Sequence, residues 1–242
     1  MGFPFSPFIG QTVTVSCTSG NLEGKLVSLS QTNCSIDVPG KGILNLPIND
    51  LKLMHFGFPS FEDATKHLAD AGEARHCPSC YIALLYAVEF LAIGFSAQAF
   101  QVRSDLIRRG IISFLANDFP SAGYALFPQA DGIVTQLLHE DGLLKQTQSF
   151  PKWTQEHPDS NFHGKSCNNL KVAIEGAAAA GNRTRLKHLH KWLGDERIKA
   201  IHKLRNKLLH GTMLEVSEHE VASLVLLLQG AHHGVAEGVN VK

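Results

Sequence analysis

The sequence predicts an α+β protein in which a small N-terminal β-barrel precedes a predominantly α-helical bundle. Short alternating apolar segments bounded by turn residues fill positions 9–55, which is the pattern of antiparallel strands. From position 60 onward the apolar residues recur with helical spacing instead. A chain of 242 residues is long enough to bury one full core and a smaller one. We therefore expect two domains, 1–57 and 58–242.

The N-terminal domain is expected to contain short strands with polar turns between them. The clearest strands span 11–17, 24–29, 33–38 and 43–46. Several short strands at turn-bounded spacing favour a small barrel. A strand, the turn at 19–21, a second strand and a hairpin ending at 48–51 resemble Sm-like or SH3-like barrels, over less than a quarter of the chain. That resemblance implies RNA binding, or equally a β module for protein contacts and dimer support.

The change to helices is expected just after Gly57-Phe58-Pro59. Ser60 is placed to cap a helix, and Glu62 and Asp63 put negative charge in its first turn. The expected helices span 60–71, 79–100, 101–116, 128–144, 166–180, 183–193, 195–210 and 217–230. The segment 145–165, rich in polar residues and Pro, is expected to be a loop.

Composition restricts the class of protein. The 22 basic residues balance the 22 acidic residues, so net charge indicates no particular partner. Five cysteines, an odd number, are not typical of a secreted disulfide framework, and no signal peptide is recognisable, so we expect a cytoplasmic protein. The apolar stretch 81–100 is interrupted by Glu89, Ser96 and Gln98, which favours a buried helix over a membrane span.

The predicted helix 195–210 combines an apolar face with an edge of polar residues. At about 100° per residue, Arg205 falls inside the apolar face. The charge of a guanidinium is costly to remove from water without a partner, so Arg205 requires one at this surface. His202, Asn206 and His210 form the neighbouring line. The apolar face itself contains Ile198, Ile201, Leu204, Leu208 and Leu209.

This helix resembles the motif helix of HEPN domains, in which an Arg and a polar residue are followed by a His. Arg205, Asn206 and His210 match that pattern, and Gly211 suits the end of the helix. The segment Phe127–Ile133 resembles a Pro-x-x-acid-Gly-Ile helix start found in some HEPN-like proteins. Asp131 stands there in place of the more common Glu.

The resemblance implies a metal-independent endoribonuclease without a cofactor. Arg205 would bind the phosphate, Asn206 would orient it, and His210 would act as acid or base. Asp131 and His202 are possible auxiliary residues. The family forms dimers with both motif helices at the interface, so one motif implies a homodimer. Common roles in the family further imply a toxin or antiviral effector, with an antitoxin or regulatory partner.

A basic stretch leads into the motif. Between Arg183 and Lys207 there are nine Lys or Arg against two acidic residues, a net charge of +7. One interpretation is a surface that attracts RNA, in which Arg197 would take part with Lys199, Lys203 and Lys207, the three lysines expected on the solvent side of the helix. The other interpretation is an ordinary solvated helix face.

The sequence leaves two rival functions open. The first is a catalytically inactive HEPN-like protein that binds RNA or nucleotide, or serves as a dimer scaffold. The second is a regulatory protein whose β module recognises the ligand and whose helices only dimerise.

A zinc site is a weaker hypothesis. Cys77 and Cys80 form a C-x-x-C, and His163 with Cys167 could complete four ligands if the intervening chain folds back. A single C-x-x-C at a helix start is more often a pair of small buried side chains, so we expect no metal.

Overall fold

The computed structural model describes residues 8–30, 32–58, 61–71, 75, 77–95, 97–146, 153–211 and 216–236. The chain divides into two compact units, an N-terminal unit of residues 1–98 and a C-terminal unit of residues 99–242. Strands give way to helices between residues 56 and 61, but the two units divide at residue 98 and not at the predicted residue 57, because the first two helices belong to the same unit as the sheet. The expected cap Ser60 lies outside the described residues.

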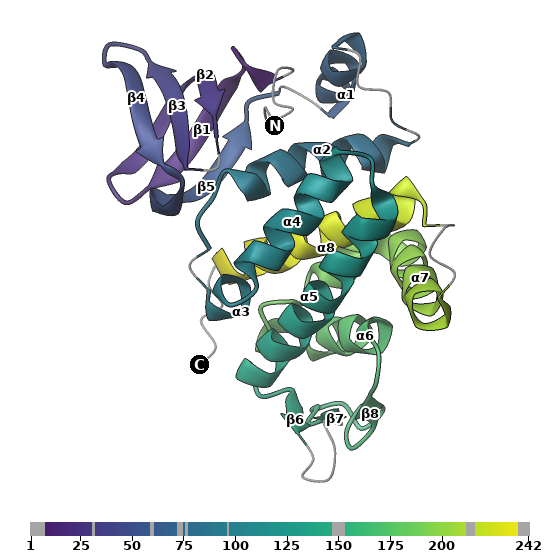
Figure 1. The fold of residues 1–242 in the computed structure, drawn as a ribbon. Helices are drawn as coiled ribbons and strands as arrows, with labels where there is room; N and C mark the ends of the chain where they lie inside the picture. Colours follow the sequence, from purple (N-terminus) through teal and green to yellow (C-terminus); the bar gives the residue numbers. More distant parts are fainter. Residues whose placement is uncertain are drawn as a thin grey trace. The chain divides into compact units, whose positions relative to one another are not determined.

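A curled antiparallel sheet of five strands, in the order β4-β3-β2-β1-β5, begins the N-terminal unit (Figure 1). Val13 and Val15 are buried and Thr12 and Thr14 are exposed, because side chains alternate between the faces of a strand. The strands are β1 (Thr12–Cys17), β2 (Gly20–Leu29), β3 (Asn33–Val38), β4 (Gly42–Pro47) and β5 (Leu51–Phe56). The sheet, followed mostly by helices, confirms the predicted α+β class.

The fifth strand was not resolved by the sequence pattern, which predicted only a hairpin ending near residue 51. A short 3-10 helix, η2 (Ile48–Asp50), turns the chain after β4. β5 then pairs with β1, with Val13 opposite Phe56. This long-range pairing makes β1 an interior strand, hydrogen-bonded on both edges.

Two helices complete the N-terminal unit, α1 (Phe61–Asp70) and α2 (Pro78–Leu91). The prediction that α2 continues to residue 100 is wrong. The chain leaves the helix after Leu91, and the Gly94 amide donates a hydrogen bond of 2.7 Å to the Leu51 carbonyl at the start of β5. Across the described part of the chain, no helix is both long and apolar enough to cross a membrane.

A buried carboxyl joins α2 to β5. The Glu89 side chain is 8% exposed, and its Oε1 lies 3.4 Å from His55 Nδ1. Burial raises the pKa of Glu89, an effect that the hydrogen bond from His55 opposes. The same hydrogen bond raises the pKa of His55, against an opposing effect of burial. Burial raises the pKa of Tyr86, and the nearby charge of Glu89 adds to this effect.

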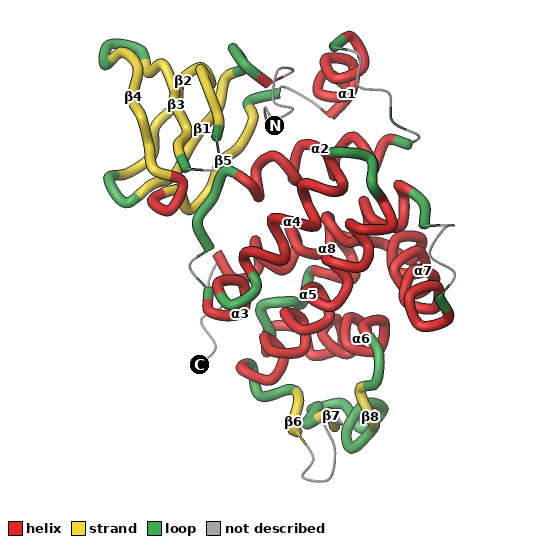
Figure 2. Tube along the Cα trace, viewed as in Figure 1, coloured by secondary structure: helices red, strands yellow, loops and turns green. Residues whose placement is uncertain are grey.

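The C-terminal unit is a helical bundle, drawn from teal to yellow in Figure 1 and red in Figure 2. α5 packs on α4, α6, α7 and α8, and α8 also contacts α4 and α7. The helices are α3 (Gln98–Gln101), which begins at the last residue of the N-terminal unit, α4 (Ser104–Leu115), α5 (Phe119–Glu140), α6 (Leu170–Ala180), α7 (Leu189–His210) and α8 (Glu218–Ala236), with the 3-10 helix η3 (Gly181–Arg183) after α6.

α5 begins at Phe119, not at Pro128, so the prediction of a helix start at 127–133 is wrong. Asp118 caps the helix by accepting a hydrogen bond of 3.2 Å from the Ser121 amide. Pro128 lies inside the helix, where it removes one backbone hydrogen bond. Pro128 is itself exposed, and Tyr124, whose carbonyl loses that bond, is 54% exposed. Water can therefore satisfy the carbonyl.

The segment expected to be a loop contains strands. β6 (Leu144–Gln146), β7 (Trp153–Gln155) and β8 (Ser166–Cys167) form a small antiparallel sheet between α5 and α6. Its middle strand is anchored by Trp153, whose ring lies 5.2 Å from the His139 ring of α5, centroid to centroid. Strands this short carry little periodic signal, which is why the sequence did not predict them.

α7 carries the predicted motif and has a break at the position that the sequence indicated. Gly194 has a φ of 70°, which is unfavourable for other residues, so α7 is broken there. The helix predicted over 183–193 begins only at Leu189, because residues 181–183 form η3 and a turn follows it. Gly211 ends α7 in the left-handed conformation, also at a φ of 70°. This confirms its predicted place at the helix end.

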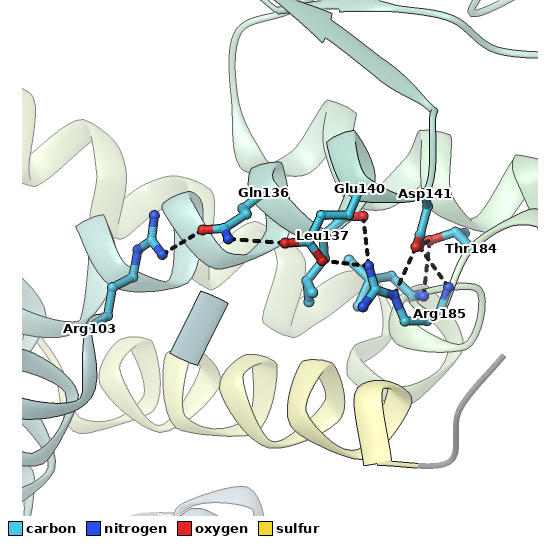
Figure 3. Close-up of polar contacts among 8 residues, drawn as sticks. Arg103, Gln136, Leu137, Glu140, Asp141, Thr184 and Arg185 are labelled. Carbon is cyan, nitrogen blue, oxygen red and sulfur yellow. Dashed lines mark hydrogen bonds and ion pairs between the residues drawn. The ribbon is translucent and has the colours of Figure 1, made fainter. Parts of the chain in front are cut away.

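A network of charged groups ties the end of α5 to the segment before α7 (Figure 3). The Asp141 side chain is 4% exposed. Its carboxylate accepts hydrogen bonds from the Thr184 hydroxyl at 2.7 Å, the Arg185 amide at 3.0 Å and Arg185 Nε at 2.8 Å. Arg185 Nη2 also donates to Glu140 at 2.8 Å, and Gln136 links Glu140 to Arg103. The network holds the entry to α7 against α5.

We expect the Asp141→Ala variant to lower the free energy of unfolding by about 3 kcal/mol, because it leaves three buried donors unpaired. Urea unfolding followed by circular dichroism measures this change. Glu140→Ala is the matched control, since Glu140 contacts the same arginine with 38% of its side chain exposed. The control should lose less than about 1 kcal/mol. Equal losses in the two variants would contradict the role assigned to burial.

We also expect stability to fall as pH rises from about 5 to about 8 through the His55–Glu89 pair. Both pKa values are raised by folding, so the folded protein binds more protons than the unfolded chain in this window. The contribution is present at the acidic end and lost as pH rises. Urea midpoints across this range should decline less steeply in Glu89→Gln, whereas Asp50→Asn, an exposed acid of the same unit, should follow the wild type.

Candidate functional site

The predicted motif occupies the last turns of α7 and lies at the surface of the bundle. Arg205 and Asn206 are half-buried, and His210 is exposed. Leu209, predicted to belong to the apolar face, is instead 63% exposed. A large apolar side chain therefore lies in solvent beside the histidine. His202, the auxiliary candidate one turn before Asn206, is half-buried.

The structure brings Asp131 of α5 close to Arg205 of α7. Asp131 is half-buried, and burial raises the pKa of its carboxyl, while the positive charge of Arg205 opposes this rise. Seventy-four positions separate the two residues in the sequence. Two different segments of the sequence indicated them as candidates. Among the described residues no hydrogen bond or ion pair joins the two, so Arg205 acts on this carboxyl only through its charge.

Lys207 does not point to solvent, so its prediction as an RNA contact is wrong. It is 9% exposed, and its Nζ lies 3.0 Å from each carboxylate oxygen of Glu220 on α8. The buried line of α7 continues from Ile201 through Leu204 to Lys207 at a spacing of three residues. Lysine is tolerated on this line because α8 supplies the opposite charge.

The partner of Lys207 also caps α8. The Glu220 carboxylate accepts a hydrogen bond of 2.8 Å from the Ser217 amide, and the Ser217 hydroxyl accepts one of 3.4 Å from the Glu220 amide. This reciprocal arrangement is a capping box. The Ser-x-x-Glu spacing was visible in the sequence and could have indicated both the helix start and a structural role for Glu220.

The other basic candidates differ in their environments. Lys199 and Lys203 are exposed, as predicted. Arg197 is half-buried, and its Nη1 donates a hydrogen bond of 2.7 Å back to the Leu193 carbonyl. Only the two lysines, among the residues predicted to bind RNA, present a fully exposed charge in the described structure.

The zinc candidates have local roles in their own units. Cys77 is the N-cap residue of α2, and its Sγ lies 3.3 Å from the Ser79 hydroxyl. Cys80 is fully buried in the first turn of that helix. In the C-terminal unit, His163 Nδ1 donates a hydrogen bond of 3.0 Å to the His157 carbonyl. Cys167 of β8 lines a cavity with Asp131.

This cavity was not predicted from the sequence. It has a volume of about 350 Å³ and lies between α5, the small sheet and the start of α6. Asp131 and Thr135 line it from α5, and Trp153 and Cys167 line it from the sheet. Burial, with a contribution from the charge of Asp131, raises the pKa of the Cys167 thiol to about 11, so the thiol is protonated at neutral pH.

Comparisons of the chain with protein-family models, with curated proteins and with solved structures found no match. The functional argument therefore rests on the residues and geometry of this site.

We expect Lys207→Met to lower the free energy of unfolding by about 3 kcal/mol, because it leaves the buried Glu220 carboxylate without its cation. Lys203→Met makes the same chemical change at an exposed position of the same helix and should alter stability by less than about 0.5 kcal/mol. Chemical denaturation of both variants tests the difference. Adding Glu220→Gln to Lys207→Met should recover part of the loss, and a double variant less stable than the single one would contradict the pairing.

Proposed function

We propose that this protein is a metal-independent endoribonuclease of the HEPN type, with Arg205, Asn206 and His210 at a site completed by a second copy of the chain. The observation that carries the proposal is that the positive charge of Arg205 acts on the carboxyl of Asp131. Arg205 belongs to the helix that resembles the HEPN motif helix, and Asp131 belongs to a second segment with a HEPN-like sequence, although that segment lies inside α5 and not at its start. Both are half-buried at the bundle surface, where a substrate can reach them.

The solvent exposure of the side chains at the end of α7 suits chemistry on a phosphodiester. Arg205 is half-buried and retains access to solvent, as a phosphate-binding guanidinium must. His210 is exposed at the end of the helix, where its imidazole is accessible to a substrate and can serve as a general acid or base. Asn206 lies between them in sequence and can donate a hydrogen bond to a phosphate oxygen.

The reaction needs no added nucleophile. His210 of one subunit removes the proton of the ribose 2′-hydroxyl, and the 2′-oxygen attacks the adjacent phosphorus. The bond from phosphorus to the 5′-oxygen breaks, and His210 of the partner subunit gives that oxygen its proton. Arg205 stabilises the additional negative charge on the phosphoryl oxygens. The products are a 2′,3′-cyclic phosphate and a 5′-hydroxyl.

The surface around His210 supports the dimeric form of the proposal. Leu209 is 63% exposed beside His210, at a position where a partner subunit would bury it. In a twofold interface the same surface patch of each subunit faces its copy. If His210 lies near the twofold axis, the two copies of His210 come together. Lys199 and Lys203, exposed on the same helix, would attract the RNA backbone in a salt-dependent manner.

One observation favours a second candidate function, a HEPN-like protein that binds RNA without cleaving it. The carboxyl of Asp131 competes with phosphate for Arg205, because both are anionic partners of the same guanidinium. Cleavage requires the phosphate to displace or share this partner. Retention of RNA by a protein that does not cut it would identify this second function.

We expect purified wild-type protein to cleave structured RNA in the presence of EDTA. His210→Ala and Arg205→Ala should each reduce the rate by at least about 100-fold, because each removes a group that acts on the transition state. Gel analysis of the RNA and identification of the cyclic phosphate end test the reaction. His188→Ala is the control, since His188 is an exposed histidine at the start of the same helix.

Sedimentation of the same samples tests the dimer. A protein that is monomeric at micromolar concentration, or one that is dimeric and pure but leaves RNA intact, would overturn the proposal. Loss of activity only on chelation would point to a metal-dependent reaction instead.

A further inference from the structure

The cavity beside Asp131 has the size and lining of a small-molecule site. Its volume of about 350 Å³ is within the range of ligand pockets, which begins at about 300 Å³. Asn168, which is exposed, lies at its rim, and Asp131 and Thr135 lie one helical turn apart on the same face of α5. The cavity is therefore open to solvent and carries hydrogen-bonding groups along one wall.

The carboxyl of Asp131 is available to a ligand. Among the described residues it forms no hydrogen bond, and Arg205 acts on it only through its charge. A half-buried carboxylate without donors gains free energy from any ligand that supplies them. Two parallel N–H groups on one edge of a ligand would satisfy both of its oxygens.

The small sheet contributes an aromatic side chain to the cavity lining. The indole of Trp153 lines the cavity, is half-buried, and is held against the ring of His139. Indole rings bind planar heterocycles by stacking, with little loss of conformational entropy. The ligand is thus flat, and it carries adjacent N–H donors at its edge.

We propose that this cavity binds a guanine base. Guanine presents a ring N–H and an exocyclic amino group side by side, which match the two oxygens of a carboxylate. Adenine and cytosine each offer only an amino donor on that edge, and uracil only a ring N–H. The remaining acceptors of guanine can be satisfied by the Thr135 hydroxyl and the Asn168 amide. The statement that this guanine belongs to an RNA substrate rests on the proposed ribonuclease function.

Titration with GMP tests the proposal directly. Trp153 reports binding by its fluorescence, and calorimetry gives an independent measurement. GMP should bind at least about tenfold more tightly than AMP, CMP or UMP, because only guanine satisfies both carboxylate oxygens. Asp131→Asn should abolish this preference, because one carboxylate oxygen becomes an amino group. Asp105→Asn, the same change at an exposed acid of the C-terminal unit, should retain it.

A second experiment distinguishes guanine in RNA from a free guanine nucleotide. If the base belongs to the substrate, wild-type cleavage sites should lie next to guanines, and Asp131→Asn should cut without this preference. Tight GMP binding with cleavage sites unrelated to guanine would assign the cavity to a free nucleotide. Equal binding of all four nucleotides, or GMP binding unchanged in Asp131→Asn, would overturn the proposal.

The test of GMP binding can fail or succeed independently of the test of ribonuclease activity. GMP binding is measured without catalysis, and His210→Ala should bind GMP as the wild type does. Selective GMP binding by a protein that cleaves no RNA would support the cavity and overturn the ribonuclease. Cleavage by a protein that does not bind GMP would support the ribonuclease and overturn the guanine site.

Discussion

The C-terminal unit is organised around the burial of α8. Every residue from Val221 to Leu228 is buried, so this helix has no face that can be left in solvent. A helix that is apolar all round must be enclosed by its neighbours. α4, α5 and α7 contact it, and their mutual positions follow from that shared packing. The proximity of Arg205 to Asp131 is a consequence, because the helices that carry them are held by α8.

Buried charges then refine the positions that apolar packing sets. Lys207 pairs with Glu220 one helical position beyond Asn206, and Asp141 binds the segment that leads into α7. Neither pair adds much net stability, because the free-energy cost of removing the charges from water nearly cancels the attraction between them. Their value is geometric, since a misplaced helix would leave a charge unpaired. The motif-bearing part of α7 is thus fixed at both ends, while its outer side remains accessible.

The candidate site combines solvent accessibility with electrostatic influence between its residues, as the proposed chemistry on RNA would require. His210 and Leu209 are exposed, whereas Arg205 and Asp131 are half-buried and influence each other. Exposed groups can meet a second subunit and a substrate, and half-buried groups exert stronger electrostatic effects than exposed ones. Asp131 also lines the adjoining cavity, so the proposed guanine site would lie next to the proposed ribonuclease site.

Local patterns in the sequence were sufficient for the features that depend on neighbouring residues. The strand-to-helix change near residue 57, the break at Gly194 and the helix end at Gly211 follow from periodicity and backbone sterics within a few positions. The motif of Arg205 and His210 was likewise visible. The burial of Lys207, the pairing of β5 with β1 and the cavity at Asp131 were not. Each depends on a partner from a distant segment, and only tertiary packing decides which distant groups meet.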